Sequence, residues 1–169
     1  MKKAIIILAI IIMILSINKK EAVTIPKESI RFRIIANSNN TEDQKLKKEV
    51  LQQLKNNIKQ FNSATNINDS REIIKKEIPS FDEIVKNTLK ESEYQEDYNI
   101  NYGTNYFPEK KYKNVVYPEG YYESLVVTLG EGEGNNFWCV LFPPLCLVDK
   151  NQEDVEYTSI IKEIIDKYF

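Results

Sequence analysis

The chain has 169 residues and a formal net charge of -2, with two cysteines and no histidine. Without histidine it cannot form a Ser-His-Asp triad, a Cys-His dyad or a histidine-containing zinc site, and two cysteines cannot supply a four-thiolate zinc site. The balanced charge disfavours nucleic-acid binding, which needs a strongly basic face. Hydrophobic residues make up 42% of the chain, as expected for one globular domain. These histidine-dependent catalytic sites and these zinc sites are therefore excluded, and we expect no cofactor, no metal and no nucleic-acid partner.

The first residues form a candidate export segment. Lys2 and Lys3 precede an apolar run from Ala4 to Ile17, which is shorter than the ~20 residues of a membrane span and fits a secretory signal. No small-x-small cleavage site is evident at its end, so a cleaved signal peptide and a retained membrane anchor both stay open, against the alternative of a buried core helix. We assign residues 1–24 to this segment and residues 25–169 to an exported domain, which contacts membrane only through the N-terminal segment.

The exported domain begins with a strand and a helix. Residues 30–36 read I-R-F-R-I-I-A, and this alternation predicts a half-buried strand. Residues 37–40 are turn formers and N-cap candidates, and Thr41-x-x-Gln44 has the spacing of a capping box. Apolar residues then recur at helical spacing, which predicts a helix over about 41–60.

A second helical region starts near Ser70, after a polar loop. Pro79 removes a helical hydrogen bond, and Ser80-x-x-Glu83 could restart the pattern. We therefore predict two short helices with a break or kink near Pro79.

The second half of the chain changes to the period of strands. Tyrosines and an isoleucine of one parity predict a strand within residues 94–102, followed by an irregular connection over 103–113. Strands at 121–129 and 137–142, joined by the Gly130–Asn136 loop, are predicted to form a hairpin, and residues 157–168 form an amphipathic helix. The order β-α-α-β-β-β-α predicts a single α+β domain, with a mostly antiparallel sheet of about four strands covered by helices.

The glycine-rich loop admits several chemical interpretations. Glu131 and Glu133 could be the carboxylate pair of a glycosidase, which needs two acids across a cleft, but they lie two residues apart in one loop that is expected to be solvated. A calcium loop lacks its aspartate spacing, and the glutamates would repel a phosphate. A flexible connection or an exposed recognition loop is the favoured interpretation.

The two cysteines are candidates for a disulfide. Cys139 and Cys146 would be ~23 Å apart along a straight strand, so a bridge requires the chain to reverse, and Pro143-Pro144 is a plausible place for that reversal. Export permits a disulfide. The bridge is favoured over the alternative of two buried, unpaired thiols.

Aromatic side chains crowd one region. Tyr121, Tyr122 and Trp138 could bind sugar rings or a partner protein, or simply belong to a sheet core and its rim. Residues 137–142 are apolar on both faces, so this strand needs two covers. One cover is the helix layer, and the other is a partner, a membrane surface or the C-terminal helix.

Two blocks of the sequence resemble the stage II sporulation protein R family of endospore-forming bacteria. The first is I-R-F-R-I-I-A-N-S-N-N-T-E-D-Q-K-L-K at 30–47, and the second is Y-P-E-G-Y-Y-E-S-L-V-V-T-L-G-E-G-E-G-N-N-F-W-C-V-L-F-P-P-L-C-L-V-D at 117–149. Their order and spacing agree with the family, as does the export segment. Phe137 stands where a second tryptophan is expected, which keeps an aromatic contact.

The resemblance implies a sporulation signalling protein that is exported from the forespore into the space between the forespore and mother-cell membranes. There, members activate a membrane-embedded aspartic peptidase, the sporulation sigma-E factor processing peptidase, by protein contact. The resemblance carries over no catalytic residues, and on this basis we expect that the protein is not an enzyme. We predict that the contact surface contains two tyrosines, two glutamates, two asparagines and a tryptophan, namely Tyr121, Tyr122, Glu131, Glu133, Asn135, Asn136 and Trp138.

Two other functions compete with this one. An exported envelope glycan hydrolase would use Glu131, Glu133 or another carboxylate as acid and base, and would need a second acid across a cleft. A glycan-binding module would use the tyrosines and would bind cell-wall material.

Overall fold

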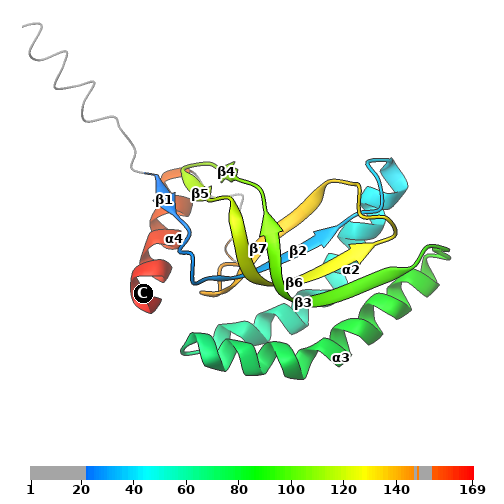
Figure 1. Cartoon of the computed structure of the whole chain (residues 1–169), viewed down its shortest axis with the longest axis horizontal. Coiled ribbons are helices and arrows are strands. Elements are labelled where there is room, and N and C mark those ends of the chain that lie inside the picture. Colours follow the sequence, from blue (N-terminus) through cyan, green and yellow to red (C-terminus); the bar gives the residue numbers. More distant parts are fainter. Residues whose placement is uncertain (1–21, 147, 149–153) are drawn as a thin grey trace, which may run out of the picture.

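The computed structural model describes residues 22–146, 148 and 154–169. Its main sheet has the strand order β3-β6-β2-β7 (Figure 1). These strands are β2 (Ile30–Ile35), β3 (Tyr98–Phe107), β6 (Gly120–Leu129) and β7 (Asn136–Phe142). Strand β2 is parallel to β6, whereas the β2–β7 and β3–β6 pairs are antiparallel. The predicted α+β class, with a mostly antiparallel sheet of about four strands, is confirmed.

Helices and a smaller sheet surround the main sheet. The helices are α2 (Thr41–Gln60), the short 3-10 helix η1 (Phe61–Ser63), α3 (Ile67–Glu91) and α4 (Asp154–Tyr168). The smaller sheet contains β1 (Val23–Thr24), β5 (Val115–Tyr117) and β4 (Lys110–Tyr112), in that order. Within the described residues, no helix has both the length and the apolar content needed to cross a membrane. The predicted export segment lies almost wholly in residues 1–21, outside the described residues.

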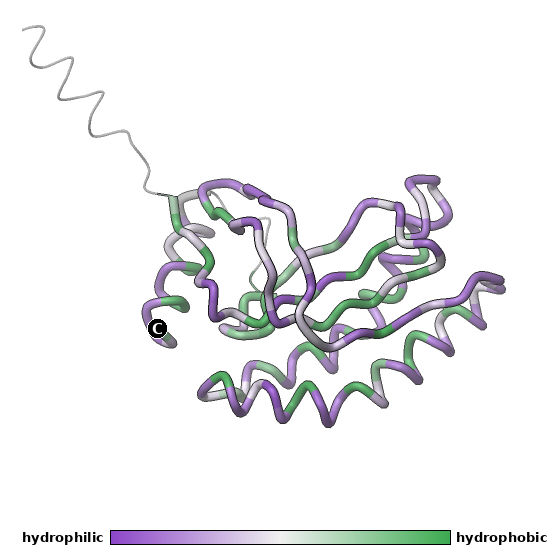
Figure 2. The backbone as a smooth tube through the Cα atoms, viewed as in Figure 1, coloured by the Kyte–Doolittle hydropathy of each residue, from purple (hydrophilic) through white to green (hydrophobic). Residues whose placement is uncertain are grey.

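Two hydrophobic cores cover the two faces of the main sheet. Helices α2 and α3 pack against one face, and Figure 2 shows hydrophilic and hydrophobic residues alternating along α3, as in an amphipathic helix. On the other face, Trp138 and Val140 of β7 pack in one cluster with Tyr157 and Ile161 of α4. Of the alternatives for the second cover of residues 137–142, the structure therefore places the C-terminal helix there.

Helix α2 has the bounds that the sequence predicts. Its N-cap is Asn40, whose side-chain oxygen accepts a hydrogen bond from the backbone N–H of Asp43 at 2.7 Å. Glu42 and Asp43 occupy the first turn, where the helix dipole favours negative charge. The strong local capping signal explains why the start of this helix is predictable.

Helix α3 continues through Pro79, so the prediction of two short helices was wrong. The Pro79 side chain is exposed, so the carbonyl group that loses its helical partner there can bond to water. Contacts with α2 hold both sides of the proline, because the side-chain amide of Asn57 donates to Glu77 at 2.8 Å and to Ser80 at 2.9 Å. This tertiary support outweighs the local loss at the proline.

The predicted hairpin of residues 121–142 was also wrong. Strand β2 lies between β6 and β7, so the Gly130–Asn136 loop spans the width of an intervening strand instead of joining neighbours (Figure 1). Strands in a sheet are ~4.8 Å apart, so the ends of β6 and β7 are separated by roughly 10 Å, which a tight two-residue turn does not span. The length of the loop therefore fits the crossing.

The predicted irregular connection at 103–113 is mostly strand. Each residue of β3 from Tyr98 to Phe107 has a partner in β6, and β4 and β5 follow with a turn at Lys113, whose φ is 53°. Pairing with β6 carries the strand through Gly103, a residue that is unfavourable in strands on propensity alone.

Candidate partner-binding site

A buried carboxylate organises the turn that links β2 to α2. Asp43 is only 7% exposed. Its Oδ2 accepts hydrogen bonds from the Asn37 amide at 3.2 Å, the Ser38 hydroxyl at 2.6 Å and the Asn40 amide at 3.1 Å. These bonds satisfy the buried charge and fix the side chains of the whole turn.

The glycine-rich loop is fastened to this turn. The backbone N–H of Glu131 donates to the Asn37 side-chain oxygen at 2.9 Å, and that of Glu133 donates to the Asn37 carbonyl at 2.9 Å. A third bond runs from the Asn135 backbone N–H to the Asn39 side-chain oxygen, at 2.7 Å. The loop is therefore a fixed structure, not the flexible connection that the sequence allowed.

Glycine is required where the two segments touch. Gly130 has a φ of +54°, and a Cβ there would overlap the Asn37 side chain. A Cβ on Gly134 would overlap the carbonyl oxygen of Ser38. On the α2 side, the Lys47 ammonium donates to the carbonyl of Asn135 at 2.7 Å, which ties the end of the loop to the helix. The blocks 30–47 and 117–149, which are far apart in the sequence, thus meet here.

Exposed carboxylates gather around this junction. We call them the acidic end, and they are Glu42, Glu93, Glu96, Asp97, Glu131 and Glu133. Asp97 adjoins the loop, because its carbonyl accepts a hydrogen bond from Gly130 at 2.7 Å, and a hollow of about 440 Å³ is lined by Glu42, Glu93 and Glu96. Of the predicted contact residues, Glu131, Glu133 and Asn135 lie exposed at this end, while Asn136 is half-buried at the start of β7.

Tyr121 lies far from the acidic end. It is 69% exposed and packs edge-to-face against Tyr106, with ring centroids 5.5 Å apart. Tyr121 is at the start of β6, whereas the glycine-rich loop follows the end of that strand, roughly 25–30 Å away at strand rise. The structure therefore does not bring Tyr121 and the loop into one contact patch.

Tyr122 and Trp138 belong to the second core. They are 5% and 9% exposed, respectively. Tyr122 lies under the guanidinium group of Arg31, whose Cζ is 3.3 Å from the ring centroid, and Trp138 packs edge-to-face on Phe107 at 5.1 Å. Their buried positions indicate a structural role, which is the core-and-rim alternative that the sequence left open.

Two arginines of β2 lie against the second core, a position that the sequence pattern did not predict. Arg31 is 1% exposed, and Arg33 stacks on Phe107 with its Cζ 4.7 Å from the ring centroid. Burial lowers the pKa of both guanidinium groups, and in Arg31 the neighbouring Tyr122 and Tyr117 oppose that shift. Because these arginines alternate with apolar residues, the sequence indicated that their side chains would face solvent. In the structure, α4 and the small sheet pack on that face and cover them.

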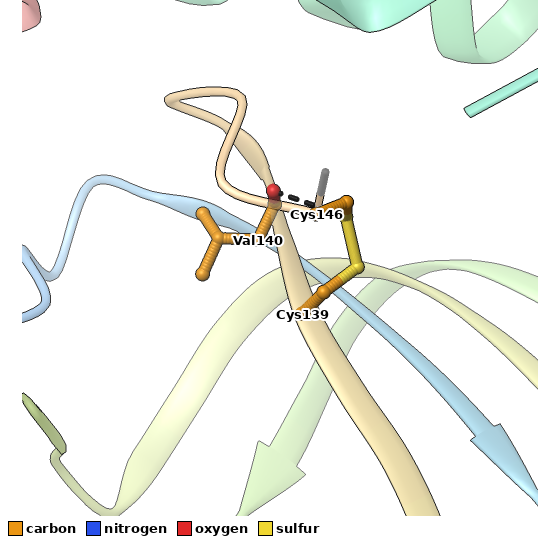
Figure 3. The surroundings of a disulfide bond; sticks show 3 residues. All are labelled: Cys139, Val140 and Cys146. Carbon is orange, nitrogen blue, oxygen red and sulfur yellow. Dashed lines mark hydrogen bonds between the residues drawn. A yellow bond between two sulfur atoms is a disulfide. The ribbon is translucent and has the colours of Figure 1, made fainter. Parts of the chain in front are cut away.

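The two cysteines form a disulfide in the structure. Their Cα atoms are 5.0 Å apart, because the chain reverses after β7, where the Phe142-Pro143 peptide bond is cis. The Leu145 N–H donates to the Val140 carbonyl at 3.1 Å. The Cys146 sulfur also lies 3.2 Å from that carbonyl oxygen (Figure 3). This contact is not a hydrogen bond, because a disulfide sulfur carries no proton.

The carboxylate of Glu123, on β6, is held by hydrogen bonds from two side chains. Arg71 of α3 binds it through Nε at 3.0 Å and Nη2 at 2.8 Å, and the Tyr102 hydroxyl donates to it. The Arg71 hydrogen bond lowers the pKa of Glu123, while partial burial opposes that shift. A glycosidase acid needs a raised pKa, so this group is an ion-pair clamp between α3 and β6. The described residues contain no cluster of side chains suited to a metal ion.

These features define a two-core α+β domain with a fixed, acidic loop junction at one end of its sheet. The chain belongs to the stage II sporulation protein R family, whose sequence model matches residues 26–152. It is 37% identical over 147 residues to stage II sporulation protein R of Bacillus subtilis (strain 168), covering 82% of this chain and 66%, just under two thirds, of that protein. No solved structure matches the chain. The resemblance inferred from the two blocks is confirmed.

Proposed function

We propose that this protein is an exported sporulation signal that activates the membrane-embedded aspartic peptidase processing pro-sigma-E, by contact and without catalysis of its own. The observation that carries the proposal is membership of the stage II sporulation protein R family. On this proposal the protein passes from the forespore into the space between the forespore and mother-cell membranes. Residues 1–24 act as a signal peptide or an anchor.

Activation by contact has a simple thermodynamic requirement. The protein must bind the active conformation of the peptidase more tightly than the inactive one, since only differential affinity shifts an equilibrium. A binding surface that is already fixed loses little conformational entropy on association. The hydrogen bonds that fasten the glycine-rich loop to Asn37 and Asn39 provide such a surface.

The acidic end is the proposed contact surface. Its exposed glutamates include Glu131 and Glu133 on the fixed loop, and they favour a receptor surface that carries Lys or Arg. Charge complementarity of this kind raises association rates and excludes wrong partners. Tyr121 is left out of this surface because of its distance from the loop, and Tyr122 and Trp138 are left out because they are buried.

The test is co-expression of the full chain with the peptidase and pro-sigma-E in a non-sporulating cell. Glu131→Gln with Glu133→Gln should reduce cleavage of pro-sigma-E without changing the melting temperature. The matched control is Glu156→Gln with Glu163→Gln, two exposed carboxylates of α4, which should leave cleavage intact. No cleavage with the wild-type chain, or release of soluble peptidoglycan by the purified protein, would contradict the proposed function.

A further inference from the structure

Strand β3 is an open edge of the main sheet. It is 10 residues long and pairs with β6 on one side only. On its other side, none of the described residues makes a backbone hydrogen bond to it. An edge of this length offers a row of peptide groups that another extended chain can pair with.

The alternation of hydrogen bonds between β3 and β6 shows which backbone N–H and C=O groups of β3 point away from β6. The Gly130 N–H donates to the Asp97 carbonyl at 2.7 Å, so residues of the same parity as Asp97 bond toward β6. The alternate residues direct their N–H and C=O groups away from β6. These residues are Tyr98, Ile100, Tyr102, Thr104 and Tyr106.

This edge lacks the features that normally prevent pairing with other chains. The segment YNINYGTNYF contains no charged residue and no proline, and its register with β6 has no bulge. The opposite edge of the sheet, β7, differs. There the Leu145 N–H donates a hydrogen bond to the Val140 carbonyl, next to the disulfide. Within the part of the chain that the structure describes, one edge of the sheet is thus partly covered and the other is open.

The surroundings of β3 indicate the chemistry of an occupant. Its start adjoins the acidic end, where Glu96 and Asp97 are exposed, together with Asp82 of α3. None of these three carboxylates has an ion-pair partner among the residues described. The hollow beside the start of β3 is lined by Glu93, Glu96 and Asp97 and also by Lys86 and Lys90, so acids outnumber bases there by three to two. A segment lying along β3 would therefore gain from a Lys or Arg near the Asp97 end.

We propose that the β3 edge binds an extended segment of the partner protein as an additional strand, with a basic residue of that segment at the acidic end. Strand addition draws affinity from main-chain hydrogen bonds and specificity from flanking side chains. The inference rests on the proposed function, since the partner is the activated peptidase. It adds the mode of recognition, an extended backbone, to the charge contact already described.

The test is Thr104→Pro in the same co-expression system. Thr104 is exposed, its N–H points away from β6, and the residue before it is a glycine, so proline removes an edge donor without breaking the β3–β6 ladder. Cleavage of pro-sigma-E should fall roughly tenfold, equivalent to about one or two backbone hydrogen bonds. Thr104→Val keeps the N–H and should retain cleavage. A photo-crosslinking residue at position 104 should capture the peptidase, and one at Asn56 on α2 should not.

The outcomes separate the two proposals. If the wild-type chain supports no cleavage, the proposed function fails. If it supports cleavage, and Thr104→Pro retains full cleavage, the edge inference fails while the function stands. If Thr104→Pro lowers the melting temperature, the crosslinking experiment at position 104 of the otherwise unchanged chain tests whether the β3 edge contacts the peptidase. Capture of a second copy of this chain instead of the peptidase would also overturn the inference.

Discussion

The side-chain oxygen of Asn37 accepts a hydrogen bond from the backbone N–H of Glu131, 94 residues further along the chain, at 2.9 Å. The Asn37 carbonyl also accepts from Glu133, and its amide donates to Asp43. One asparagine therefore links the carboxyl end of β2, the first turn of α2 and the glycine-rich loop.

Asn37→Ala should loosen this junction. It removes the side-chain bonds to Glu131 and Asp43, so the free energy of unfolding should fall by about 1–2 kcal/mol. Amide exchange in residues 130–135 should accelerate, measured by hydrogen–deuterium exchange. Asn56→Ala, at an exposed position of α2, is the control and should change stability by less than about 0.5 kcal/mol. Unchanged exchange in the loop would contradict the assigned role of Asn37.

Two glycine substitutions should differ sharply. Alanine at Gly134 would overlap the Ser38 carbonyl oxygen and meet that of Ala36 at 2.8 Å, so Gly134→Ala should destabilise the domain by about 2–3 kcal/mol. A Cβ at Gly103 meets Asn101 Oδ1 at 3.7 Å, an ordinary contact, so Gly103→Ala should be nearly neutral. Chemical denaturation of both variants checks this, and equal costs would show that the loop does not sit against the turn as described.

The Glu123 ion pair should make stability fall in acid. Because Arg71 lowers the pKa of Glu123 below its ordinary 4.5, the stabilisation is complete above that value and is lost as the pH falls through the folded-state pKa. Arg71 is partly exposed, so the effect is on the order of 1 kcal/mol. Melting temperatures from pH 7 to 3 should decline less steeply in Glu123→Gln than in the wild-type protein. Parallel curves would exclude the clamp as a source of the acid sensitivity.

The disulfide should stabilise the end of β7. The bridge between Cys139 and Cys146 closes a short loop and so lowers the conformational entropy of the unfolded chain. In the chain-entropy account, this stabilises the folded state by about 2.5 kcal/mol. The denaturation midpoint of Cys139→Ala with Cys146→Ala should therefore be lower than that of the oxidised protein, and thiol alkylation of the native protein should find no free cysteine. Two reactive thiols would show that the bridge does not form.

Local signals made the bounds of α2 predictable, whereas contacts between segments far apart in the chain explain what the sequence did not reveal. The Asn40 cap and the apolar period set the bounds of α2 within the chain itself. The continuity of α3 through Pro79 depends on Asn57, a residue of another helix. Sequence order alone also could not show that β2 separates β6 from β7, because this depends on pairing across about 90 residues.

The candidate site was only partly predictable for the same reason. Glu131, Glu133 and Asn135 could be assigned to an exposed loop from local composition. The separation of Tyr121 from that loop and the burial of Tyr122 and Trp138 follow from the length of β6 and from the second core. The anchoring role of Asn37 had only one local sign, a run of turn-forming asparagines.

The central position of β2 in the main sheet has a consequence for the export that we propose. This strand is the first of the main sheet to leave the ribosome, yet both of its neighbours follow about 90 residues or more behind it. The sheet therefore cannot close until nearly the entire domain has been synthesised. On the proposed export, the chain would therefore remain unfolded while it crosses the membrane and would fold on the far side.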